Sequence, residues 1–184
     1  MKVLTQDRLK ELLEYDPATG DFVWKVTRGG RKAGSVAGTL GANGYRRIKV
    51  DRTPYYSHRL TFLFMEGSFP PDCVDHINHK EADNSWSNLR HATVEENNKH
   101  KSMQANNTSG ITGVVWCKSR GKWQAQIFVD GKNIYLGLTH DFDEARRWRK
   151  AAEVKYGFSE FHGQPLEAFA RLDKSDFAYL EEYA

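Results

Sequence analysis

The sequence contains little cysteine and no long apolar run. Only two cysteines occur among 184 residues, too few for a disulfide framework or a cysteine-rich zinc site. No apolar stretch approaches the length of a membrane span, and the first residues lack the apolar core and cleavage site of a secretory signal. We therefore expect no membrane association and a cytosolic location, in the host cell if the protein is phage-encoded. Any catalytic metal must be held by oxygen and nitrogen ligands.

The net charge is also small, at +3, but the basic residues are unevenly distributed. Residues 23–52 contain one acid, Asp51, and residues 99–122 contain none. Such concentrations of positive charge suit a phosphate backbone, although a solvated lysine-rich face would have a similar composition. The candidate DNA contacts in the first of these segments are Arg28, Arg31, Lys32, Arg46, Arg47 and Lys49.

The length suits two small domains. In the first domain, apolar periodicity and turn residues predict a helix over 5–14 capped by Thr5, strands over 21–26 and 45–50, and a helix over 56–65 closed by Pro70 and Pro71. A polar, turn-rich stretch over 104–110 predicts a linker. Beyond it we expect strands over 112–117, 122–129 and 132–138, an Asp130-Gly131 hairpin, and a helix over 143–156.

Polar residues that suit phosphodiester hydrolysis are concentrated between residues 74 and 98. Asp75 and His76 end a short apolar stretch, and Asn88 follows a polar loop. Thr93 with Glu96 matches a capping box, which predicts a helix that carries Asn97 in its second turn. The predicted order is therefore strand, loop, strand, helix.

Hydrolysis of a phosphodiester needs an activated water, a cation beside the phosphate, and a group that fixes the base. His76 is the candidate base, and Asn88 would hold its ring through hydrogen bonds around the hairpin. Asp75 and Asn97 offer oxygen ligands of the kind that Mg²⁺ or Mn²⁺ prefers, with one ion per site. Because neighbours on a strand point to opposite faces, we expect a bend that lets Asp75 and His76 reach one phosphate.

This arrangement resembles the HNH nuclease family and its ββα-metal fold, in particular the phage and intron-encoded homing endonucleases. The likeness runs through three segments, Ser57-His58-Arg59-Leu60, Val74-Asp75-His76-Ile77-Asn78 and Ser87-Asn88-Leu89-Arg90. It implies that His76 is the general base, Asn88 its supporting asparagine, and Asp75 and Asn97 the metal ligands. Many members have histidine where Asn97 stands, which leaves the preferred metal open. Members with asparagine there are still nucleases, often nicking ones.

The three strands and helix after residue 110 resemble the AP2 DNA-binding domain. Trp123, Ala125 and Ile127 should face the helix and leave the other sheet face open to read base edges in the major groove. The Arg-rich positions of AP2 domains are here Val115, Gln126, Phe128 and Asn133, which implies an altered sequence preference or a lower affinity. The candidate DNA contacts in this module are Lys118, Arg120, Lys122, Gln124, Gln126, Asn133 and Tyr135. A sheet that only supports the nuclease is the alternative.

The sequence thus predicts an α+β protein in two parts. Residues 1–103 would form an HNH nuclease domain with a β-rich N-terminal extension and a core over 56–101. Residues 111–184 would form an AP2-like domain, a three-stranded sheet packed on one helix, with a C-terminal extension. The expected function is metal-dependent, site-selective cleavage of double-stranded DNA, nicking one strand, by a monomer or weak homodimer. The alternatives are a non-catalytic DNA-binding regulator and a nuclease acting on structured DNA or RNA.

Overall fold

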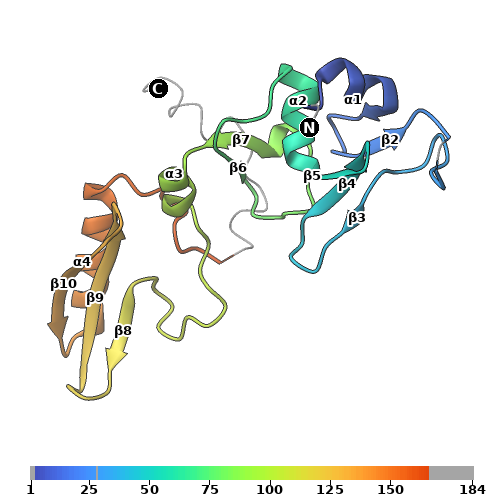
Figure 1. Cartoon of the computed structure of the whole chain (residues 1–184). Helices are drawn as coiled ribbons and strands as arrows, with labels where there is room; N and C mark the ends of the chain where they lie inside the picture. The colour runs from blue at the N-terminus through green and yellow to red at the C-terminus, as the bar shows by residue number, and fades with distance from the viewer. Residues whose placement is uncertain (1–2, 28, 166–184) are drawn as a thin grey trace. The chain divides into compact units, whose positions relative to one another are not determined.

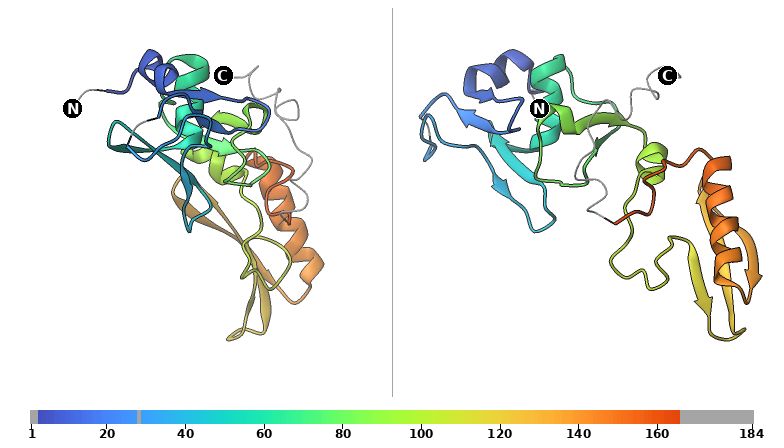
Figure 2. Two further views of the ribbon diagram at one scale, coloured as in Figure 1. Left: turned by 90° about the vertical axis from the view of Figure 1, so that its right-hand side faces the viewer. Right: turned by 180° about the vertical axis from the view of Figure 1, so that it is seen from behind.

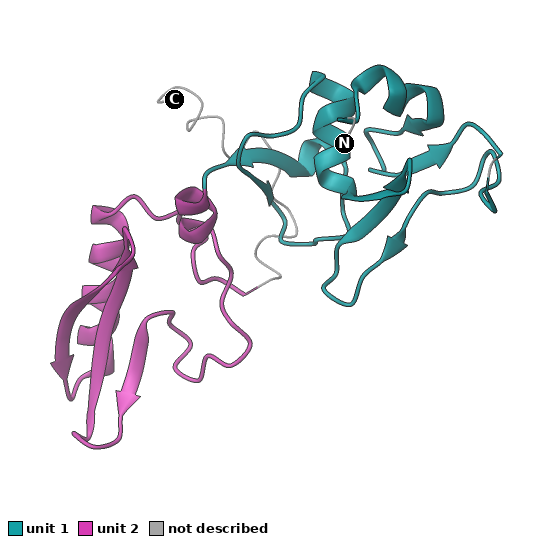
Figure 3. Cartoon of the chain, in the orientation of Figure 1, with its two compact units in different colours: residues 1–93, 170–184 teal, residues 94–169 magenta. Residues whose placement is uncertain are grey.

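The computed structural model describes residues 3–27 and 29–165. The chain forms two compact units that divide between Thr93 and Val94 (Figure 3). Arg28 and the expected C-terminal extension from residue 166 onward lie outside the described residues. Within the described part of the chain, no helix is both long and apolar enough to cross a bilayer. The mixed α+β architecture expected from the sequence is confirmed.

Over its described residues, the first unit combines two α-helices with three small sheets (Figure 1). Its elements are α1 (Gln6–Leu12), β1 (Leu13–Tyr15), β2 (Phe22–Trp24), β3 (Thr39–Leu40), β4 (Arg46–Val50), β5 (Thr53–Tyr56), α2 (Ser57–Glu66), β6 (Cys73–His76), a short 3₁₀ turn over Trp86–Asn88, and β7 (Leu89–Ala92). The sheets are the antiparallel pair β1-β2, the antiparallel sheet β3-β4-β5 and the antiparallel pair β6-β7.

Both predicted helices of the first unit are present. The Thr5 side chain accepts a hydrogen bond from Arg8 N at 3.3 Å, which caps α1 as expected, and Leu9 and Leu12 are buried. The end of α2 differs from the expectation. Gly67 ends the helix in the left-handed conformation at φ +84°, which glycine adopts without steric cost, so the helix stops before it reaches Pro70.

Side chains alternate between the two faces of β4, so Arg46 shares the face of Ile48 and Val50. Ile48 and Val50 are buried, whereas Arg47 and Lys49 are exposed on the other face. The buried residues join a core built from α1, β1, β2 and α2. The exposed basic face of this sheet therefore stands on a well-packed support.

The β6-β7 hairpin carries the residues expected to perform the chemistry. Its register pairs Asp75 with Arg90 and His76 with Leu89, with no irregularity along the four paired positions. The bend that we expected at Asp75 and His76 is therefore absent. The two side chains leave opposite faces of a regular strand, and each one meets different partners.

Between residues 94 and 165, the second unit contains a short helix, one sheet and one long helix. Its elements are α3 (Val94–Lys99), β8 (Val114–Cys117), β9 (Lys122–Val129), β10 (Lys132–Thr139) and α4 (Phe142–Lys155). The strand order is β10-β9-β8, and α4 runs along one face of this sheet (Figures 1 and 2). Asp130 and Gly131 both have positive φ, at 50° and 75°, as the predicted two-residue hairpin requires.

The stretch expected to be a linker, residues 104–110, lies within the second unit. The Asn107 side-chain oxygen accepts hydrogen bonds from the backbone nitrogens of Ser109 and Gly110, at 3.1 and 2.7 Å. Just before it, Met103 N donates to Gln164 O at 2.9 Å. The Asn107 bonds order the stretch itself, and the Met103 bond joins the residue before it to the loop at Gln164.

Candidate active site

His76 is almost fully buried, with 6% of its surface exposed. Its Nε2 lies 3.3 Å from the side-chain oxygen of Asn84. Burial lowers the pKa of His76, and this effect outweighs the hydrogen bond with Asn84, which acts to raise it. The imidazole is therefore neutral at neutral pH and able to accept a proton.

Asp75 points to the other side of β6 and pairs with Arg90. Nε and Nη2 of Arg90 both contact the Oδ2 atom of Asp75, at 2.8 and 2.7 Å. The carboxylate is 4% exposed and the arginine side chain 13%. A pair this deeply buried holds Asp75 in its ionised form, because protonation would leave a desolvated guanidinium without its countercharge.

Asn88 closes the loop between β6 and β7 from the inside. Its side-chain oxygen accepts from Asn78 N at 2.9 Å, and its amide nitrogen donates to Asp83 O at 2.7 Å. The backbone of Ile77 adds a bond to Asn88 O at 2.9 Å. Asn88 therefore supports His76 by fixing the loop that follows it, whereas the residue in contact with the imidazole ring is Asn84.

An aromatic ring and a second histidine pack against the ring of His76. His58, on the first turn of α2, lies 5.2 Å from His76 between ring centroids, and Tyr45 lies 5.7 Å from it. Tyr56 stacks on His58 at 5.3 Å and an interplanar angle of 12°. Burial, followed by the repulsion that a protonated His76 would exert, lowers the pKa of His58 to about 3. Its Nδ1 atom is buried without a hydrogen-bond partner among the described residues.

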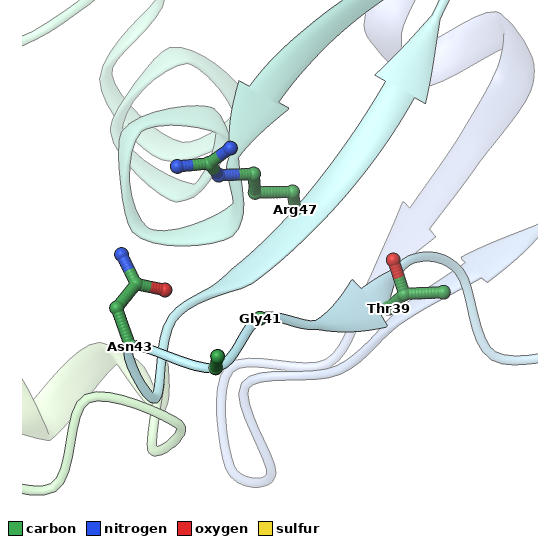
Figure 4. A pocket seen from close by; sticks show the side chains of 5 residues that line it. Thr39, Gly41, Asn43 and Arg47 are labelled. Carbon is green, nitrogen blue, oxygen red and sulfur yellow. The ribbon is translucent and has the colours of Figure 1, made fainter.

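This aromatic cluster connects to the basic face of β4. The guanidinium of Arg47 lies 4.6 Å from the ring centroid of Tyr56 and donates to its hydroxyl oxygen. Arg47 also lines a pocket at the β3-β4 turn, where its side chain and that of Asn43 project into the same space above Gly41 (Figure 4). A cation, an amide and an accessible backbone are the groups that bind a phosphate oxygen.

Comparisons with known proteins identify the segment that contains this site. The profile of the HNH endonuclease family matches residues 55–99. A protein of Acanthamoeba polyphaga mimivirus named Uncharacterized HNH endonuclease L560 is 31% identical over 140 residues, which cover 75% of this chain and 67% of that protein. The chain belongs to the HNH endonuclease family. It is therefore a nuclease, as the sequence predicted.

Two further proteins are similar to this HNH endonuclease over part of its length. Protein 3.8 of Escherichia phage T7 is 30% identical over 99 residues, covering 54% of this chain and 74% of that protein. A structure titled "DNA binding and cleavage by the HNH homing endonuclease I-HmuI" aligns with a TM-score of 0.35 and 24% identity. That alignment spans 45% of this chain and 47% of the other.

The ligands of a metal were predicted to be Asp75 and Asn97. Among the described residues, no three His, Cys, Asp or Glu side chains gather into a metal-binding cluster. The Asp75 carboxylate is paired with Arg90, and its role as a ligand stays a prediction. Asn97 lies on α3, partly buried, and is described with the second unit. Its role as a ligand remains a prediction from the sequence.

The candidate DNA contacts of the first unit differ in their surroundings. Arg31 lies 4.3 Å above the ring centroid of Trp24 and donates to Lys49 O, so its side chain is partly committed to the fold. Lys32, Arg47 and Lys49 are exposed, and Arg46 is half-buried.

In the second unit, the candidates gather on the sheet face opposite α4. Ala125 and Ile127 are buried toward the helix, so Gln124 and Gln126 face outward, as the alternation predicts. The Gln126 side-chain oxygen accepts from Gln124 Nε2 at 3.3 Å and from Asn133 Nδ2 at 3.0 Å. Beside this amide network, the remaining candidates extend from the face to the β8-β9 turn: Tyr135, Lys122, Lys118 and Arg120.

The sequence analysis did not assign a role to three residues around His76, namely Asn84, His58 and Tyr45. His58 appeared there only within the segment that resembles the HNH family. Asn84 sits in a polar loop without periodicity, where composition indicates a turn and nothing more. The available signal was indirect, because a loop with several Asn, Asp and Ser side chains can satisfy its own backbone and fix a neighbouring group.

Proposed function

We propose that this HNH endonuclease binds double-stranded DNA site-selectively and hydrolyses one phosphodiester bond per binding event with the help of a divalent cation. The observation that carries this proposal is the state of His76. It is a buried, neutral imidazole whose ring is fixed by the Asn84 amide. A general base for water needs this combination of a free lone pair and a fixed direction.

In the proposed mechanism, His76 accepts the proton of the attacking water. The protein positions the ring before DNA arrives, which removes the cost of ordering it during the reaction. Asn88 contributes by closing the loop after β6. Each chain supplies one such base, so one binding event nicks one strand, and a double-strand break requires a second chain or a second event.

A hard cation suits the donor chemistry of the site. A carboxylate and a neutral amide oxygen are ligands that Mg²⁺ and Mn²⁺ accept, and Arg90 keeps the Asp75 carboxylate ionised. We therefore propose Asp75 as a ligand, with Asn97 added on the sequence pattern alone. When bound, the cation would stabilise negative charge on the phosphate and the departing oxygen.

We propose two surfaces that hold the DNA. On the first unit, the exposed face of β4 with Arg47 and Lys49 suits the phosphate backbone, and Arg47 leads through Tyr56 and His58 toward His76. On the second unit, the outward face of β8-β10 would act as an AP2-like reader, in which Gln124, Gln126 and Asn133 contact base edges. Its support is a row of outward-facing amides, partly exposed at Gln124 and Gln126 and exposed at Asn133, on a sheet whose opposite face is buried.

The test is cleavage of a supercoiled plasmid library of genomic fragments in the presence of Mg²⁺ or Mn²⁺. We expect the native chain to produce nicked circles and His76→Ala to lose about 100-fold or more in rate while it still binds DNA. His91→Ala is the matched control, because it removes an exposed imidazole from the neighbouring strand β7 and should cleave normally.

Two results would contradict the proposal. If His76→Ala cleaves at the native rate, His76 is not the base. If the native chain binds DNA with every cation tried and cuts neither plasmid, junction nor RNA, the chain acts as a DNA-binding regulator on a nuclease fold.

A further inference from the structure

The loop between β6 and β7 is held by its own side chains. Asp83 accepts from Ser85 Oγ and from Asn78 Nδ2, both at 2.7 Å. Burial acts to raise the pKa of Asp83, but these hydrogen bonds lower it overall, so the carboxylate stays ionised. Asn84, the next residue, is 1% exposed. A buried amide in a loop with this many fixed bonds has one orientation.

That orientation determines which atom of Asn84 faces His76. The amide nitrogen Nδ2 donates to Ala82 O at 3.1 Å, and a carbonyl oxygen can only accept. The other atom, Oδ1, is therefore the one 3.3 Å from His76 Nε2. Because Oδ1 has no hydrogen to give, Nε2 must carry the ring proton, and the lone pair of the neutral imidazole is on Nδ1.

The β1-β2 hairpin packs closely against this loop and forms hydrogen bonds with it. The Tyr15 hydroxyl donates to Asn84 O at 2.8 Å, and Trp86 N donates to Pro17 O at 2.9 Å. Burial raises the pKa of Tyr15 to about 12, so the hydroxyl remains a donor. Gly20, at φ +76°, comes so near that a Cβ there would lie 2.2 Å from the Asn84 carbonyl carbon.

We propose that Asn84 is a positioning residue that fixes the Nε2-protonated tautomer of His76, and that Tyr15 in the N-terminal hairpin fixes Asn84. This inference rests on the proposed function, in which His76 is the base. It gives the β1-β2 hairpin a role that its sequence does not suggest, because it contains none of the residues assigned to the reaction. Its contribution is to keep the reactive nitrogen of His76 facing the attacking water.

The tautomer can be observed directly in the full-length protein. Long-range ¹H–¹⁵N spectra at neutral pH distinguish a protonated Nε2 from a protonated Nδ1, and the His76 signals are assigned by their absence from His76→Gln. We expect the native chain to show the Nε2-protonated form alone. Asn84→Ala should show a mixture of both tautomers. A native chain with the proton on Nδ1 would overturn the proposal without any need for variants.

Kinetics supply the second readout. In single-turnover cleavage at saturating protein, Asn84→Ala should slow the reaction about tenfold to 100-fold, as loss of a partner that orients a reactive imidazole does, with unchanged DNA affinity. Tyr15→Phe keeps the ring and should slow cleavage about fivefold, the effect of one hydrogen bond. Glu14→Ala is the control, because it removes an exposed side chain next to Tyr15 on β1 without touching the His76–Asn84 pair, and it should keep the rate and tautomer.

The failure of this inference differs from the failure of the proposed function. If His76→Ala cleaves normally, the assignment of the base is wrong. If His76→Ala is inactive while Asn84→Ala keeps the native tautomer and rate, Asn84 has no positioning role. If Asn84→Ala does not fold, Tyr15→Phe and the native spectrum decide, and an unchanged rate in Tyr15→Phe counts against the hairpin.

Discussion

The two units differ in how far their candidate functional side chains are exposed to solvent. In the first, Asp75, His76 and Asn88 are no more than 6% exposed, and each has a fixed partner. In the second, the candidate reading face is open, and its Phe128 and Tyr135 are 59% and 57% exposed. Groups that carry out chemistry gain from desolvation and fixed direction, whereas groups that read a partner must remain accessible until it binds.

The supports behind these groups differ as well. The loop around His76 is held by polar contacts from Asn88, Asp83 and Tyr15. The sheet of the second unit is held by apolar packing, in which the Trp148 ring lies directly against Gly137 of β10. Damage to the first unit should therefore appear as lost turnover, and damage to the second as lost folding or lost binding.

The largest expected effect separates turnover from recognition. His76→Ala should lower the single-turnover rate about 100-fold or more and leave DNA affinity intact. Gln126→Ala removes the shared acceptor of the amide network and should weaken affinity by about 1–3 kcal/mol. The defect of Gln126→Ala should vanish at saturating protein in a combined binding and cleavage titration. If either variant loses both the single-turnover rate and DNA affinity, catalysis and recognition are not separated between the two units.

Local patterns predicted most of the secondary structure. Thr5 caps α1, Asp130-Gly131 forms the hairpin, and the alternation along β9 separates its two faces. Each of these features depends on residues close together in sequence, where propensity and periodicity act. The segment that holds Asp75, His76 and Asn88 was recognisable because residue type and spacing are set by the chemistry.

The rest depends on contacts between residues distant in sequence. Nothing local indicates that Tyr15 reaches Asn84, 69 positions away. The hydrogen bond between Met103 N and Gln164 O is likewise invisible in the composition of the neighbouring 104–110 stretch. The regular strand at Asp75 and His76 also differed from expectation. Asp75 contacts Arg90 on one face of the hairpin, and His76 contacts Asn84 on the other.

The next effect tests the apolar support of the second unit. A Cβ at position 137 would lie 2.3 Å from the Trp148 ring, so Gly137→Ala should cost about 1–3 kcal/mol of folding stability through overpacking. Hydrogen exchange of the β9 amides, measured at increasing denaturant concentration, would give the change in the free energy of unfolding. In the Trp148→Leu background the clash is gone, and Gly137→Ala should then cost much less. Additive costs would show that the ring is not the obstacle.

A smaller effect follows from His162, which is 5% exposed in the second unit. Burial, followed by the charge of Arg149, lowers its pKa from 6.5 to about 4. Below pH 6.5 this histidine takes up a proton in the unfolded chain but not in the folded chain. The free energy of unfolding should therefore decrease as the pH is lowered from 6.5 to about 4. The slope is at most about 1.4 kcal/mol per pH unit.

Substitution of His162 by glutamine tests that slope. Glutamine can still accept a hydrogen bond from Arg149 Nη2, which the native Nε2 accepts at 3.1 Å, but it does not titrate. His162→Gln should therefore flatten the pH dependence of hydrogen exchange in β9, while the same change at the exposed His140 leaves it steep. Equal slopes in all three proteins would show that His162 does not govern acid stability.

The smallest effect concerns the exposed basic face of the first unit, where the contrast between the units should weaken. Arg47 is proposed to contact DNA, as the second unit is, yet its guanidinium packs on Tyr56, which stacks on His58 beside His76. Arg47→Ala should lower the slope of log affinity against log salt by about one, because one phosphate contact releases about one counterion. Arg146→Ala, which removes an exposed arginine paired with Asp143 on α4, should leave the slope unchanged. If Arg47→Ala instead slows cleavage at saturating protein without altering the slope, Arg47 belongs to the chemical site and not to the grip on DNA.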